Sequence, residues 1–198
     1  MTFEEYRELI FSDFYREDGR TGYVNLLKEL IIGEAFKYSF WMRTCTFLRQ
    51  YKLLKYSLYI ISCLMYRHYT YKFGISIPTS TKIGGGFYIG HFGGIIVNKD
   101  TIIGKNCNIS QGVTLGQANR GAKKGTPVIG NNVYIGPGAK LVGRVVIGNN
   151  VAIGANSVVT KDIEDNAVVV GVPGKVISYE GVDGYIGFTD YKTNLKSN

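Results

Sequence analysis

Hydrophobic residues recur with two different spacings along the chain of 198 residues, and the change falls near residue 75. In the first part they follow helical spacing, and Thr2 with Glu5 has the form of a capping box. The pattern predicts a first helix from about residue 3, a second over residues 23–32, and a third helical stretch from about residue 34 to residue 66.

From residue 77 the spacing becomes six. The aliphatic positions are Ile83, Ile89, Val97, Ile103, Ile109, Leu115, Ile129, Ile135, Leu141, Ile147, Ile153 and Val159. A small or β-branched residue usually stands two positions earlier, and a glycine or small residue often follows. Two inward residues in six describe one short strand and a corner, and three such sides close a coil of about 18 residues. The period predicts a triangular parallel β-helix, with phase breaks before Val97 and over residues 117–127.

The chain therefore divides into a helical region (residues 1–74), a β-helix (residues 75–177) and a tail (residues 178–198). The fold class is mainly β. The tail shows no clear period, and we expect it to lie over a neighbouring chain or to be poorly ordered.

Composition agrees with this division. Repeated tight corners explain why 26 glycines stand against 4 prolines. Three cysteines without a CxxC pair indicate neither a disulfide framework nor a zinc knuckle, which fits a reducing cytoplasm. The acidic start of the chain is unlike a signal peptide.

The net charge of +8 is concentrated in residues 35–74, which hold seven Lys or Arg and no Asp or Glu. Their longest uncharged run covers residues 56–66, too short for a bilayer span of about 20 residues. Two interpretations stay open: packing on the β-helix or a neighbouring subunit, and peripheral contact with an anionic membrane at its inner face. We expect no nucleic-acid partner, because no recognised binding module accompanies the charge.

The repeats resemble those of the hexapeptide acyltransferases, which are left-handed β-helices that use acetyl-CoA. Two segments resemble the serine acetyltransferase branch: Ile83-Gly-Gly-Gly-Phe-Tyr-Ile-Gly-His91 and Asn106-Cys-Asn-Ile-Ser-Gln-Gly-Val-Thr-Leu-Gly116. The resemblance covers about half of the chain. It implies an acetyl-CoA-dependent O-acetyltransferase and a homotrimer with sites between subunits.

Three departures from that branch concern the acceptor. The branch has an aspartate where Ser76 stands, another aspartate where Gly90 precedes His91, and an Arg-His pair where Gly125 and Thr126 precede Pro127. The groups that grip serine in the branch are therefore missing. The remaining pattern looks more like acetyltransferases of capsule, exopolysaccharide or lipopolysaccharide assembly, which favours a sugar hydroxyl as the acceptor.

His91 is the candidate general base, because it stands where the repeat slips by two residues and its side chain can leave the wall of the helix. Ser76 is a candidate for orienting it, and a backbone N–H near Gly116 or Gln117 is a candidate oxyanion donor. The resemblance points to Gly136, Pro137 and Ala155 for acetyl-CoA, with Lys161 and Lys175 near its phosphates. The projecting loop offers substrate contacts at Asn119, Arg120 and Lys123.

Four alternatives stay open: serine O-acetylation in cysteine biosynthesis, N-acetylation of an amino sugar, a non-catalytic scaffold, and metal-assisted hydrolysis. The last is disfavoured, because such an enzyme on this fold needs three histidine ligands and the chain has only His68 and His91. We expect no metal.

Overall fold

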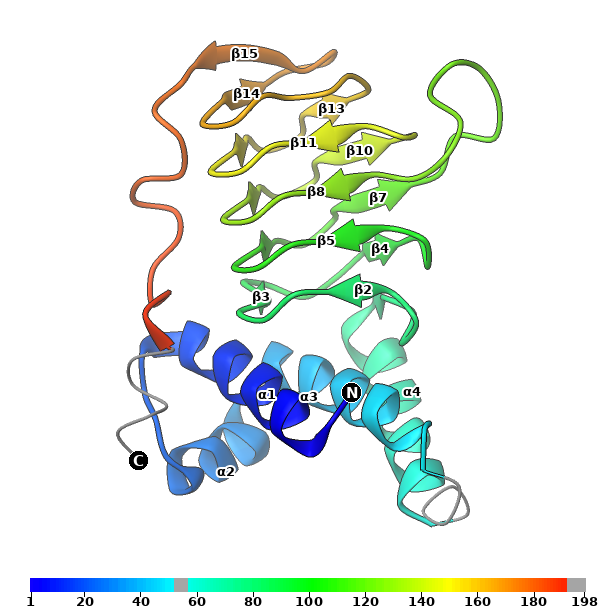
Figure 1. Ribbon diagram of the computed structural model, residues 1–198, viewed down its shortest axis with the longest axis vertical. Helices are drawn as coiled ribbons and strands as arrows, with labels where there is room; N and C mark the ends of the chain where they lie inside the picture. Colours follow the sequence, from blue (N-terminus) through cyan, green and yellow to red (C-terminus); the bar gives the residue numbers. More distant parts are fainter. Residues whose placement is uncertain (52–56, 192–198) are drawn as a thin grey trace.

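The computed structural model describes residues 1–51 and 57–191. Four helices come first and lie together at one end of the molecule, with a tall prism of short strands above them (Figure 1). The helices are α1 (Phe3–Asp18), α2 (Tyr23–Ile32), α3 (Ala35–Leu48) and α4 (Leu58–Phe73). The capping box at Thr2 and Glu5 is present.

The prism has three faces, each a sheet of mostly parallel strands. Up to β13, each pairing joins a strand to the one three places later in the chain, and at the end of face C β12 pairs with β14 and β14 with β15. Face A holds β1 (Ile75–Ser76), β4 (Ile95–Val97), β7 (Thr114–Gly116), β10 (Lys140–Val142) and β13 (Val158–Val159). Face B holds β2 (Lys82–Ile83), β5 (Ile102–Ile103), β8 (Val128–Ile129) and β11 (Val146–Ile147). Face C holds β3 (Tyr88–Ile89), β6 (Asn108–Ile109), β9 (Tyr134–Ile135), β12 (Ala152–Ile153), β14 (Val168–Val170) and the antiparallel β15 (Lys175–Ser178). The predicted left-handed parallel β-helix behind a small helical region is confirmed.

The six-residue period corresponds to the inside of the prism. Every aliphatic position of the period from Ile89 to Val159 is buried, at 3% exposure or less. Ile83, in the first coil, is half-buried. The positions two residues earlier, such as Thr101, Cys107 and Val133, are also buried, so each side contributes two inward residues.

Asparagine, as well as glycine, turns the chain at its corners. At the B–C corner, between faces B and C, successive coils place Asn106, Asn132, Asn150 and Asn166 at positive φ. Their amides form a ladder, with N···O distances of 2.9, 3.1 and 3.3 Å from one coil to the next. Asparagine tolerates this backbone region better than other residues with a side chain, and the ladder satisfies the amides in return.

A buried ion pair fixes the helical region to the first coil. Arg43 of α3 meets Asp13 of α1 at 2.9 Å, and both side chains are less than a tenth exposed. Arg43 also donates to the carbonyl oxygens of Ile83 (2.7 Å) and Gly84 (2.6 Å), while Asp13 accepts from the Phe87 N–H at 2.8 Å. A buried pair with both partners satisfied holds its neighbours in one geometry.

The third helical stretch differs from the prediction. It is two helices, because α3 ends at Leu48 and α4 begins at Leu58. Lys52 and Lys55 of the basic stretch lie outside the described residues, as do residues 192–198. None of the helices in the described part of the chain has both the length and the apolar character needed to cross a membrane. Contact of residues 35–74 with a membrane surface stays a prediction.

The tail also differs from the expectation. Residues 179–191 run back along face C toward α1 of the same chain (Figure 1). Tyr185 stacks on Tyr134 at 4.7 Å, its carbonyl accepts from the Asn108 amide at 3.0 Å, and Tyr191 is buried. Aromatic residues at irregular spacing hold this segment, so a search for a period does not detect it.

Candidate active site

His91 lies at the C–A corner of the first coil, between β3 and β4. From Ile89 to Ile96 the chain advances seven residues, whereas between their paired residues in the next coil, Ile109 and Thr114, it advances five. Since the Gly112 N–H donates to the Gly93 carbonyl at 2.7 Å, the register resumes at Gly93. His91 and Phe92 are therefore the two extra residues, and both are exposed. The slip of two residues in the sequence is a bulge that carries the candidate base out of the wall.

Helix α4 supports this bulge. The Phe92 ring packs against Phe73 at 4.8 Å between centroids, and Phe73 stacks on Tyr69 at 5.3 Å. Beside them, the Ile95 N–H donates to the Gly74 carbonyl at 3.2 Å, directly after the helix ends. The sequence did not single out Phe92; its only signal there is an aromatic residue directly after the histidine.

Three of the predicted cofactor positions share the C–A corner with His91. Gly136 and Pro137 turn the third coil, and Ala155 turns the fourth. Between them, Gly94, Gly112 and Gly138 all have positive φ, and an added Cβ at Gly112 would lie 3.3 Å from the Gly138 Cα. The glycines make the corner a narrow track that runs from His91 along the prism, and a thin ligand can approach their backbone closely.

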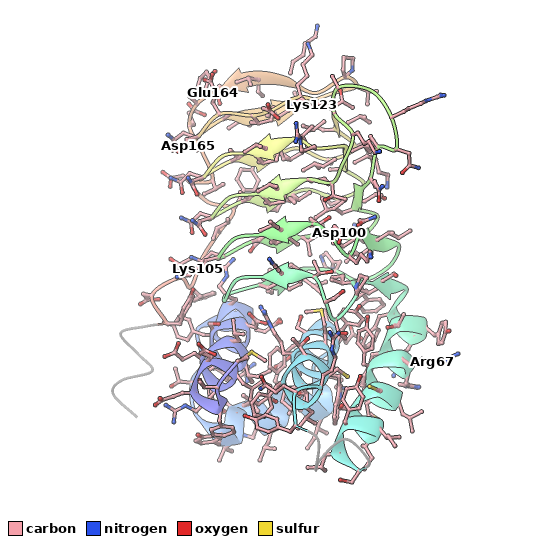
Figure 2. All side chains as sticks on the ribbon, turned by 45° about the vertical axis from the view of Figure 1, so that its right-hand side comes forward. Arg67, Asp100, Lys105, Lys123, Glu164 and Asp165 are labelled. Atoms are coloured by element: carbon pink, nitrogen blue, oxygen red, sulfur yellow. The ribbon has the colours of Figure 1, made fainter. Side chains whose placement is uncertain are left out.

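Other predicted residues lie at the A–B corner, across face A from His91. Gly116 ends β7 there, the loop that begins with Gln117 projects from it, and Lys161 follows β13. Figure 2 shows Lys123 and Asp100 on this side of the prism, with Lys105 and Asp165 on another. Within one chain the loop is not brought to His91, because a strand of face A separates the two corners.

The remaining predicted residues lie on face A, at the end of the prism and in the projecting loop. Ser76 is exposed on β1 of face A, paired with Ile96. Lys175 begins β15 just after the last C–A corner. Lys123 binds Asp162 of its own chain at 2.6 Å, and its hydrogen bonds hold the pKa of that carboxyl below its usual value. Asn119 accepts from the Gln117 amide at 2.9 Å, and Arg120 is exposed.

The sequence did not point to two polar residues that lie near the His91 corner. Lys140 of face A donates from Nζ to the Gly112 carbonyl, and Gln111 turns the second coil with a buried Oε1 that has no hydrogen-bond partner among the described residues. Neither had a distinctive signal, because outward lysines and corner glutamines are ordinary in such repeats.

The chemistry available at this corner is proton transfer beside a track for an extended ligand. An exposed imidazole can act as a general base, and the glycine corner admits an extended ligand along the prism. Among the described residues, no group of three His, Cys, Asp or Glu side chains is arranged to hold a metal.

Comparisons with known proteins agree with this geometry. Residues 126–161 match the bacterial transferase hexapeptide (six repeats) model. A serine acetyltransferase of Synechococcus elongatus is 43% identical over 109 residues, which cover 55% of this chain and 45% of that protein. The chain thus has the hexapeptide repeats of bacterial transferases and has serine acetyltransferase homologues. It spans about half the length of the curated relatives it matches.

Solved serine acetyltransferases share the fold over most of the chain. The Neisseria gonorrhoeae enzyme in complex with serine has a TM-score of 0.69 and 26% identity, covering 89% of this chain and 70% of the other. The Brucella abortus enzyme in complex with coenzyme A has a TM-score of 0.68 and 25% identity, covering 88% and 67%.

The expectation of a sugar acceptor in surface-polysaccharide assembly is therefore wrong. These homologues are serine acetyltransferases, and the serine alternative fits better than a sugar or glycan partner. The expectation rested on three local departures, at Ser76, Gly90 and residues 125–126. Local departures do not identify an acceptor, because other side chains, from this chain or a second one, can supply the same contacts.

Support from α4 can be tested directly. Replacing Phe92 with alanine removes the ring that packs on Phe73, so we expect the His91 backbone order parameter to fall from about 0.85 to below about 0.6. Nuclear magnetic relaxation measures this. Phe92→Leu should keep most of the order, and Phe188→Ala, which alters an aromatic side chain of the tail, should leave His91 unchanged. An unaltered His91 in Phe92→Ala would show that the stack does not position it.

Proposed function

We propose that this chain is an acetyl-CoA-dependent O-acetyltransferase that acts on the hydroxyl of serine. The observation that carries the proposal is the likeness to serine acetyltransferases over nearly the whole chain, including a structure in complex with serine. The His91 bulge supports it by offering a base at a corner that can admit a pantetheine arm.

The reaction assigns His91 the role of general base. Its neutral imidazole takes the proton of the serine hydroxyl as the oxygen attacks the thioester carbonyl carbon. The tetrahedral intermediate then collapses, the carbon–sulfur bond breaks, and the imidazolium returns the proton to the departing thiolate of CoA. A base of this kind contributes roughly 10²- to 10⁴-fold.

The C–A track would hold acetyl-CoA. Its pantetheine would pass the backbone at Gly136 and Pro137 and the small side chain of Ala155. The lysine ammonium is a compact positive charge that attracts phosphate. Lys175, at the end of this edge, and Lys161 of an adjacent chain would therefore bind the phosphates of CoA.

A second chain would complete the site. In one chain the A–B corner is remote from His91, but in a homotrimer the A–B corner of one prism can face the C–A corner of the next. The neighbour would then supply Asn119 and Arg120 to the amino-acid acceptor and an N–H near Gly116 or Gln117 to the oxyanion. In that arrangement the partner that orients His91 comes from Ser76 or from the second chain.

Product analysis tests the activity. The protein is incubated with [¹³C]acetyl-CoA, L-serine and a mixture of monosaccharides, and the acetylated products are identified by mass spectrometry. We expect O-acetylserine, with a rate that falls roughly 10²- to 10⁴-fold in His91→Ala and is unchanged in His68→Ala, an exposed histidine on α4. Labelled sugar without labelled serine would contradict the proposal.

Subunit mixing tests the shared site. One variant carries His91→Ala, the other lacks residues 119–124, and each alone should be nearly inactive. In randomly mixed trimers, a site with both an intact His91 and an intact neighbouring loop occurs about once in four, so about a quarter of the wild-type rate should return. Mixtures no more active than the separate variants would show that one site does not take His91 and the loop from different chains.

A further inference from the structure

A cavity lies away from the His91 corner. It has a volume of ≈ 640 Å³ and opens between α3 and the first two coils, where face B meets the A–B corner. This size is within the range of small-molecule sites, which often form where two structural units meet.

The charged side chains that line this cavity are all basic. Arg43, Arg49 and Lys82 line it, and its lining contains no aspartate or glutamate. Arg43 is already bound by Asp13, but Arg49 and Lys82 form no ion pair among the described residues. Two cations are therefore free to meet an anion there.

The depth of the cavity is apolar. Met42 and Ile103 line it and are 3% and 2% exposed, so they are held rigidly by the core, and Leu9 of α1 adds a further apolar side chain. A ligand that fits this lining has a short apolar part below its charged group.

An unsatisfied hydroxyl lies in the same place. Thr81 lines the cavity, and its hydroxyl is buried without a hydrogen-bond partner in the described part of the chain. Buried polar groups are nearly always paired, so an unpaired hydroxyl at a cavity favours a polar ligand. An adjoining cavity of ≈ 300 Å³ shares Ser80, Lys82 and Ile102 with the first and is also lined by Lys99 and Asp100.

We propose that this cavity binds a small amphipathic anion, a phosphate or carboxylate on a short apolar chain. The anion lies between Arg49 and Lys82 within reach of Thr81, and the apolar chain lies against Met42 and Ile103. Charge-assisted hydrogen bonds make the anionic group the main source of affinity. The ligand bridges α3 and face B, and it strengthens the junction that Arg43 and Asp13 hold.

Methionine-methyl nuclear magnetic resonance tests the binding in the full chain, independently of acetyl transfer. The chain has 3 methionines, of which Met42 lines the cavity and Met65 does not. Hexyl phosphate is the probe, with inorganic phosphate and 1-hexanol as its separate halves. We expect a saturable shift of Met42 and none of Met65, and at least about tenfold weaker binding of either half.

A charge-matched pair of variants controls the experiment. Arg49→Met with Lys82→Met should weaken hexyl phosphate at least about tenfold. Arg67→Met with Lys105→Met removes the same charge from exposed positions that do not line the cavity, and it should change the affinity less than about twofold. The proposal is overturned if Met42 does not shift, if hexanol binds as well as hexyl phosphate, or if both double variants weaken binding equally.

Discussion

Coil-to-coil pairing is the constraint on which the rest of the structure depends. Each coil donates to the one beside it, as from Gly104 N–H to the Ile129 carbonyl at 2.9 Å, and this fixes one inward aliphatic residue every six positions. A coil cannot take extra residues within its faces without shifting inward side chains outward. Extra residues must therefore be accommodated at a corner, where they project from the prism. The candidate base and the projecting loop are such insertions, at the C–A and A–B corners.

The helical region fixes the position of the His91 bulge, the first of these two insertions. Arg43 and Asp13 join α1 and α3 to the start of the prism, and α4 carries Phe73 against Phe92 beside His91. The helices thus do more than cap the open end of the β-helix. They hold one corner of its first coil at a defined position, which a base needs if it is to meet a hydroxyl in a reactive geometry.

The period of six predicted the prism well because each inward position is decided locally, by whether a residue turns into or away from the core. The His91 bulge was predictable for the same reason, as a slip in that period. The support by Phe92 was not, since it depends on α4 meeting a corner about twenty residues later. Nor were the break between α3 and α4 and the path of the tail, which has no period. The acceptor was wrongly predicted, because missing side chains in one chain say little about a site that a second chain can complete.

A crystal structure of the assembled protein with CoA and L-serine would test the central claim most directly. The account predicts CoA along the C–A corner past Gly136, with the serine hydroxyl within about 3 Å of a His91 ring nitrogen and the loop of an adjacent chain over the serine. CoA bound along another edge, with His91 remote from its sulfur, would contradict it.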